Sequence, residues 1–277
     1  MSVIVLLVLA AVGLASGFIA GLIGIGGGVL IVPFLYFFYG HGDWSSFHLR
    51  ENLHVTVAHA TSLLIIVPTA VRGIMSYAKD GLIVWRIAIP VALASIAGGV
   101  LGARLAISID PALLQFLFGM FLIASAIHLL IRRSREAHGK VRTNAFAITF
   151  TGMSIGVLSG MMGVGGGILA LPLLMHVLHI DLRRAASTSL VIVGAAALAG
   201  VSTYAVSGLG VQGMPRGSVG YVHVLAAVPI LIGSVISVHW GTRANQALHT
   251  RVLNLIFAAF FLLMGLKFAI ENLDVLL

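Results

Sequence analysis

The sequence predicts an all-α polytopic membrane protein of about eight transmembrane helices, arranged as two duplicated four-helix halves. Three observations predict this fold: 60% of its 277 residues are hydrophobic, only 9% are charged, and one glycine-rich pattern occurs twice. A soluble globular domain carries about 25% charged residues. A chain this apolar could not cover its surface in water, so a lipid bilayer is the medium that it fits.

Apolar runs divide the chain into eight candidate segments, since about 20 apolar residues are needed to cross a bilayer. They cover residues 2–39, 53–78, 82–107, 111–131, 143–180, 184–207, 218–242 and 250–270. The first and fifth are too long for one span, because a straight helix of that size approaches roughly 58 Å against a hydrocarbon core of roughly 30 Å. The first run also exceeds the roughly 7–15-residue core of a signal peptide and lacks a basic start, so we interpret it as a retained membrane segment.

Two glycine clusters predict where the long segments break, because glycine adopts backbone shapes that other residues avoid. The clusters are Gly26, Gly27 and Gly28, and, 139 residues later, Gly165, Gly166 and Gly167. Pro33 and Pro172 follow at the same spacing and are expected to weaken the second leg of each segment as a continuous helix. Glycines spaced by four residues precede each cluster and predict close helix packing instead. These are Gly13, Gly17, Gly21, Gly152, Gly156 and Gly160.

The duplication continues past the clusters. Thr61 and Ser62 recur 127 residues later as Thr188 and Ser189, whereas Arg104 recurs 139 residues later as Arg243. We therefore expect a first membrane repeat at 1–131, a linker at 132–142 and a second repeat at 143–277. The linker carries five basic residues against one acid, which favours a cytoplasmic position and a multi-pass protein of the cell (inner or plasma) membrane. Four crossings per repeat would make the repeats parallel, and two crossings of each broken segment would make them inverted.

The broken segments predict an anion site. A helix that starts inside the membrane presents unpaired N–H groups and the positive end of its dipole, and both attract an anion. We expect the hydroxyl groups of Thr61, Ser62, Thr188 and Ser189 to complete the shell, although such hydroxyls also bond to their own backbone. Arg104 and Arg243 are either an outer electrostatic funnel or snorkelling interface residues.

Several other kinds of site are excluded or disfavoured. All eight acids lie in loops or at segment ends, which disfavours a cation site built on carboxylates within the membrane. The chain has no cysteine and no nucleotide-binding loop, so we expect no metal and no cofactor. The net charge of +8 is explained by lipid headgroups rather than by nucleic acid.

The paired Gly-x-Gly-Gly-Gly-x-x-x-x-x-Pro motifs, each followed by a helix with an Ala/Ser-Thr-Ser-Leu sequence, resemble the TauE/SafE family of sulfite and organosulfur anion permeases. The resemblance covers nearly the whole chain. It implies an integral membrane permease of about eight spans that moves sulfur-containing anions. Motif residues that line up are the six clustered glycines, Pro33, Pro172 and the four hydroxyl residues named above.

We therefore expect a permease for small sulfur-containing or organic anions, sulfite or sulfonate in kind, held at the midplane between the repeats. Its partners would be the small anionic substrate and the bilayer. One alternative is an intramembrane enzyme that uses His59 with Ser62, and another is a non-transporting membrane subunit. The sequence leaves open the exact substrate, the direction of transport, the energy source and the oligomeric state.

Overall fold

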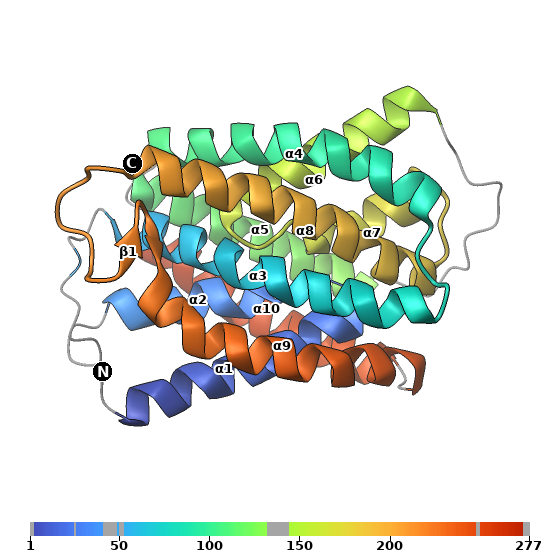
Figure 1. Ribbon diagram of the computed structural model, residues 1–277, viewed down its shortest axis with the longest axis horizontal. Helices are drawn as coiled ribbons and strands as arrows, with labels where there is room; N and C mark the ends of the chain where they lie inside the picture. Colours follow the sequence, from blue (N-terminus) through green and yellow to red (C-terminus); the bar gives the residue numbers. More distant parts are fainter. Residues whose placement is uncertain are drawn as a thin grey trace.

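The protein is described by a computed structural model, which covers residues 3–24, 26–40, 49, 53–131, 144–247 and 250–273. The predicted linker at 132–142 lies outside these residues. The described residues form ten helices and one short β-hairpin (Figure 1). The elements are α1 (Val3–Ile23), α2 (Gly28–Gly40), α3 (His54–Lys79), α4 (Trp85–Ser108), α5 (Pro111–Ile131), α6 (Ala145–Met162), α7 (Gly167–His176), α8 (Leu182–Ser207), β1 (Ser218–Val219), β2 (Val222–His223), α9 (Val224–Ala247) and α10 (Thr250–Glu271).

Six of these helices are long and apolar enough to cross a membrane: α1, α3, α4, α6, α8 and α9. Polar side chains mark where several helices begin. Asp110 accepts from the Ala112 amide at the start of α5, Asn144 accepts from Phe146 in α6, and Asp181 accepts from the Arg184 amide in α8. Such caps satisfy N–H groups that have no acceptor within the helix. The all-α polytopic class is thereby confirmed.

Both predicted breaks are confirmed, and each reverses the chain. The backbone has positive φ at Gly24, Gly26 and Gly27, and at the equivalent Gly163, Gly165 and Gly166. A Cβ atom on Gly27 would lie 2.8 Å from the Ser16 carbonyl oxygen, so the chain folds back against α1. Figure 1 shows α2 returning to the end of the bundle at which α1 begins.

The two prolines do not form the breaks. Pro33 lies inside α2 and Pro172 inside α7, and both helices continue past them. Among the described residues of the two breaks, glycines supply the left-handed backbone conformation that the reversals require.

Helices of one repeat pack on helices of the other. Helix α1 lies along α9, and its equivalent α6 lies along α4. A Cβ atom on Gly17 would lie 2.1 Å from the Ser234 carbonyl oxygen, and one on Gly156 would lie 2.2 Å from the Ser95 carbonyl oxygen. The close packing expected of the spaced glycines is thus confirmed, and the two sequence repeats interleave instead of forming separate bundles.

The equivalent helices α3 and α8 cross in opposite directions. A Cβ atom on Gly73 would lie 2.7 Å from Leu190, near the start of α8, whereas one on Gly200 would lie 2.8 Å from Leu63, near the start of α3. These helices therefore give the two repeats opposite orientations. We call the end at which α3 begins and α10 ends the terminal face, and the end at which α3 ends and α6 begins the linker face (Figure 1).

Candidate functional site

The two glycine breaks meet in the centre of the protein. A Cβ atom on Gly28 would lie 2.7 Å from the Val164 Cα atom and 2.9 Å from the Gly163 carbonyl oxygen. Ile66 and Val193, which are equivalent positions of the two repeats and fully buried, fill the space beside them. A Cβ atom on either Gly26 or Gly165 would lie 2.8 Å from Val193 Cγ1. The structure therefore brings the two clusters together, with apolar side chains between them.

Each break presents the beginning of a helix to this central region. The Leu30 and Ile31 amides donate to the Gly27 carbonyl, and the Ala170 amide donates to the Gly166 carbonyl. The N–H groups of Gly28 and Gly167 precede these first turns, where a helix has no acceptor of its own. Two positive dipole ends thus lie near each other.

Thr61 and Thr188 hold the repeats together through a reciprocal pair of hydrogen bonds. The His223 amide of the second repeat donates to Thr61 Oγ1 at 3.0 Å, and the Val84 amide of the first repeat donates to Thr188 Oγ1 at 3.1 Å. Val84 and His223 directly precede α4 and α9. Each threonine therefore satisfies an N–H group, buried at His223 and half-buried at Val84, at the start of a helix of the opposite repeat.

A tyrosine joins this network on one side only. The Tyr39 hydroxyl and His223 Nδ1 form a hydrogen bond of 3.0 Å, and the same hydroxyl interacts with Thr61. Burial lowers the pKa of His223 to about 4, against a smaller opposing effect of a hydrogen bond with the Arg216 backbone. The imidazole is consequently neutral at pH 7.

The two serines differ from each other. Ser189 Oγ donates to the Gly24 carbonyl at 2.8 Å and so ties α8 to the first break. Ser62 Oγ is buried and has no hydrogen-bond partner within the described part of the chain. Of the four predicted hydroxyl groups, Ser62 is therefore the one with unused hydrogen-bonding capacity.

The structure does not bring the two hydroxyl pairs together. Because α3 and α8 cross antiparallel, with Leu63 beside Gly200, Thr61 and Thr188 lie on opposite sides of the crossing. At about 1.5 Å per residue their separation along the helix axes is about 20 Å. One small anion cannot touch both pairs in this conformation, which corrects the single four-hydroxyl shell expected from the sequence.

Arg104 and Arg243 are likewise separated. Both are exposed near the ends of their helices, but α4 ends at the terminal face and α9 ends at the linker face. They cannot form one ring of charge around a single entrance.

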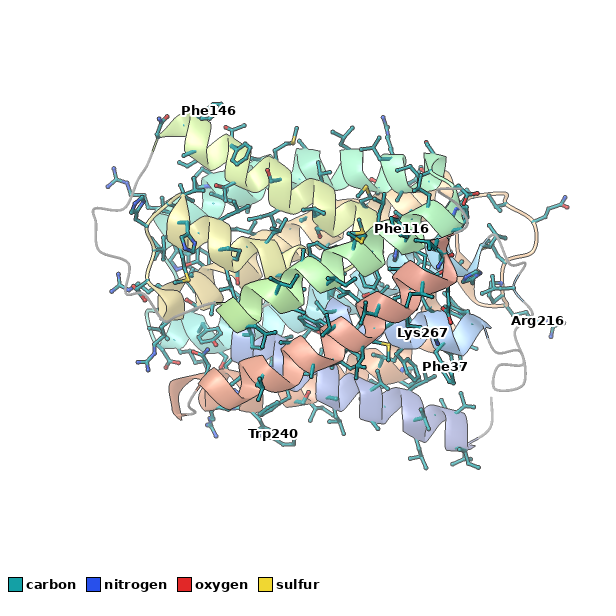
Figure 2. The ribbon with its side chains drawn as sticks, turned by 180° about the vertical axis from the view of Figure 1, so that it is seen from behind. Phe37, Phe116, Phe146, Arg216, Trp240 and Lys267 are labelled. Carbon is teal, nitrogen blue, oxygen red and sulfur yellow. The ribbon has the colours of Figure 1, made fainter. Side chains whose placement is uncertain are left out.

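A cavity of about 430 Å³ opens on the terminal face between α2 and the α5–α10 pair. It follows α2 from Gly40 to Leu30, a depth of about 15 Å, and stops less than one turn from Gly28. Its polar lining comprises His54, Gln115, Lys267 and Glu271. Lys267 and Glu271 form an ion pair of 3.8 Å, and Figure 2 shows Lys267 and Phe37 on neighbouring elements at this opening.

Beneath the cavity wall, the Tyr36 hydroxyl and His59 Nε2 form a hydrogen bond. Both side chains are buried, and Phe118 and Phe268 pack around the Tyr36 ring. Sequence reasoning gave no role to Tyr36 or Gln115, and it interpreted Lys267 only as an interface residue. A detectable signal was the polar Gln115 near the start of an otherwise apolar helix. Within the described ranges, no group of three histidines or acids could hold a metal ion.

Comparison with known proteins identifies the family of this chain. Residues 9–268 match the family described as "Sulfite exporter TauE/SafE". A "Probable membrane transporter protein" of Methanocaldococcus jannaschii is 27% identical over 92% of this chain and 92% of its own length. The "Probable membrane transporter protein YunE" of Bacillus subtilis is 26% identical over 98% and 99%, and one of Haemophilus influenzae is 28% identical over 92% and 95%. No solved structure matches. The glycine-broken hairpins and the match across nearly the whole chain make this protein a membrane transporter of the TauE/SafE family.

Proposed function

We propose that the protein is a permease for small sulfur-containing or organic anions, sulfite or sulfonate in kind, which pass the point where the two glycine breaks meet. The observation that carries this proposal is the cavity along α2, because it leads from the terminal face to the start of that helix. Helix starts favour anions. The described acids, Asp80, Asp110, Asp181 and Glu271, lie at or beside helix ends, so no carboxylate opposes an anion near the centre.

The membrane arrangement that fits this function has eight segments in two repeats, 1–131 and 143–277. Helices α5 and α10 cross in addition to α3, α4, α8 and α9, while α1–α2 and α6–α7 are broken segments in which the first leg, α1 or α6, crosses most of the bilayer and the second leg, α2 or α7, returns from inside it. The linker face is cytoplasmic, and the protein is inserted in the cell membrane. Basic residues support this orientation, because more of the described ones lie towards the linker face. Those are Arg72, Lys79, Arg86, Arg183, Arg184 and Arg243, against Arg104, Arg216 and Lys267 towards the terminal face.

The hydroxyl pairs then act in sequence rather than together. Thr61 and Ser62 contact an anion that enters from the terminal face, and Thr188 and Ser189 contact an anion that enters from the linker face. Gly26, Gly27, Gly28, Gly165, Gly166 and Gly167 form the passage between them. Ile66 and Val193 close this passage in the present conformation, so transport requires them to move apart. Arg104 and Arg243 attract anions at opposite ends.

Flux measured in proteoliposomes tests this function. Purified protein is reconstituted, and uptake and efflux of labelled sulfite and small sulfonates are followed. Saturable flux of at least one such anion is expected, and a lack of saturable flux for every anion tested would overturn the proposal. Such a result would favour the non-transporting subunit instead.

Lys267→Gln tests the cavity separately. Loss of a cation at the entrance should lower kcat/KM by roughly 2- to 10-fold at low salt, mainly through KM, and by less at about 0.15 M salt. Arg216→Gln is the matched control, because Arg216 is also an exposed cation of the terminal face but lies on the outer loop away from Lys267 (Figure 2). Equal effects of the two substitutions would show that the cavity is not the route of entry.

The enzyme alternative receives less support. The names of the family and of the relatives point to a transporter rather than an enzyme. The proposed dyad also lacks its hydrogen bond: His59 bonds to Tyr36, and Ser62 Oγ has no partner in the described part of the chain. His59→Ala distinguishes the two, since an enzyme of this kind would lose all turnover whereas a carrier retains flux.

A further inference from the structure

A second polar cavity, of about 310 Å³, lies at the linker face between α3 and α9. Arg72, Lys79 and Arg243 line it, and all three lie close enough to His239 to interact electrostatically. Asp80 is the one acid among its lining residues, which leaves a surplus of two positive charges. The negative dipole ends of α3 and α9, about half a charge each, reduce this surplus without cancelling it. The cavity therefore attracts an anion.

Hydroxyl groups add hydrogen-bonding capacity at its base. Ser76 Oγ is 2.7 Å from Thr242 Oγ1 and 3.3 Å from His239 Nδ1. Three cations beside such a cluster suit the oxygens of a phosphate group. This cavity is distinct from the cavity along α2, which opens on the opposite face.

An apolar groove continues from the basic cavity along the outside of the bundle. The groove has a volume of about 540 Å³ and shares Arg72 and Met75 with the basic cavity. Apolar residues of α3, α8 and α9 line the rest of it, from Leu64 to Met75 along α3, about 16 Å. Its lining includes Leu64, Val71, Leu198, Val201 and Val235. The basic cavity and the adjoining apolar groove therefore match the charged headgroup and the apolar acyl chain of a phospholipid.

Arg72 also needs a partner at this position. It lies about 10 Å along α3 from Lys79, inside the span, and is exposed. Arg72 forms no ion pair within the described residues, and an isolated charge at such a depth is costly. Trp240 lies one turn before Arg243, is 55% exposed and points away from the bundle (Figure 2). Exposed tryptophans mark the headgroup level of a bilayer, so the Arg243 end of the cavity lies near the lipid phosphates.

The internal duplication of the sequence does not account for the basic residues of this cavity. The positions equivalent to Arg72, Lys79 and His239 are Ala199, Val206 and Val100, so the other repeat has no such cavity chemistry. A feature needed for the shared hairpin architecture would be present in both repeats. We propose that the basic cavity and the groove bind one anionic phospholipid, with its phosphate held by Arg72, Lys79 and Arg243 and one acyl chain in the groove.

Native mass spectrometry of the full chain in detergent tests this proposal without measuring transport. The protein should retain phosphatidylglycerol in preference to phosphatidylcholine. The double variant Arg72→Gln, Arg243→Gln should bind phosphatidylglycerol roughly 25-fold more weakly, about fivefold for each cation lost. Arg86→Gln is the matched control, because Arg86 is an exposed cation of the linker face outside the cavity. Equal binding of the two lipids, or equal losses in the double variant and the control, would overturn the proposal.

Leu198→Trp separates a lipid from a free anion. Leu198 is 55% exposed in the groove, so a larger side chain there blocks the groove without disturbing the core. It should weaken phosphatidylglycerol binding and leave the basic cavity intact. Inorganic phosphate is the second ligand in the assay: if it stabilises the wild type against heat as strongly as phosphatidylglycerol does, the site is a free-phosphate site and the lipid assignment is wrong.

Discussion

Replacing Thr61 or Thr188 with valine removes one hydroxyl from each of the two symmetric contacts between the repeats. Valine has the same shape, so the main loss is the acceptor for an N–H group, the buried one of His223 or the half-buried one of Val84. An unsatisfied buried donor costs about 1–3 kcal/mol. Thr188→Val should therefore lower the free energy of unfolding by about that amount. Thr61→Val should cost about 1 kcal/mol more, because the Tyr39 hydroxyl also loses a partner.

In the Thr61→Val, Thr188→Val double variant the two losses of stability should add. Sites more than about 10 Å apart contribute additively, and these two lie about 20 Å apart along the helices. The double variant should thus lose about 3–7 kcal/mol, the sum of the two single losses. Equilibrium unfolding in mixed micelles measures these losses, with Thr61→Ser and Thr188→Ser as controls that keep the oxygen. If Thr61→Val unfolds like the wild type, the Thr61 hydroxyl is not needed to satisfy the His223 amide and the structural interpretation is wrong.

Two further predictions concern the centre and the terminal face. Gly28→Ala should lower the free energy of unfolding by about 1–3 kcal/mol and reduce flux, because the new Cβ atom meets the Val164 backbone. Gly40→Ala is the control: Gly40 has open space around it, so the substitution should change the free energy of unfolding by less than about 0.5 kcal/mol. Thermal unfolding and flux of both variants check this, and a fully active Gly28→Ala would contradict the close contact between the two breaks. His223 has a folded pKa of about 4 against about 6.5 when unfolded, so the unfolded state takes up protons first and stability should fall as the pH drops from about 6.5 to about 4. Melting temperatures across this range should decline less in His223→Gln, and identical pH profiles would refute the role of this group.

The sequence was sufficient to predict the all-α polytopic class and the positions of both breaks. The high apolar fraction alone requires a bilayer, and clustered glycines destabilise a helix so strongly that it ends there. The sequence could also predict close helix packing at the spaced glycines, because a row of glycines on one helix face allows another helix to approach closely. Gly17 against Ser234 is such a contact, although its partner helix could not be identified from the pattern.

The arrangement of the candidate site could not be predicted from equivalence of positions. Matching residues such as Thr61 and Thr188 lie near each other only if the symmetry axis passes close to both. The antiparallel crossing of α3 and α8 places that axis nearer to Ile66 and Val193, and so separates the threonines. The hydrogen bond between Tyr36 and His59 could not be predicted from the sequence either, because it forms only if the chain reverses at Gly26 and Gly27.

The interleaving of α1 with α9 and of α6 with α4 has a consequence for biogenesis. When the first half has left the ribosome, α1 has not yet met the helix against which its glycines pack, and the Val84 amide has no threonine hydroxyl to accept its hydrogen bond. Neither half is a folding unit. Assembly must wait until α9 is inserted, and a chain cut between α5 and α6 should regain its native form only when both fragments share one membrane.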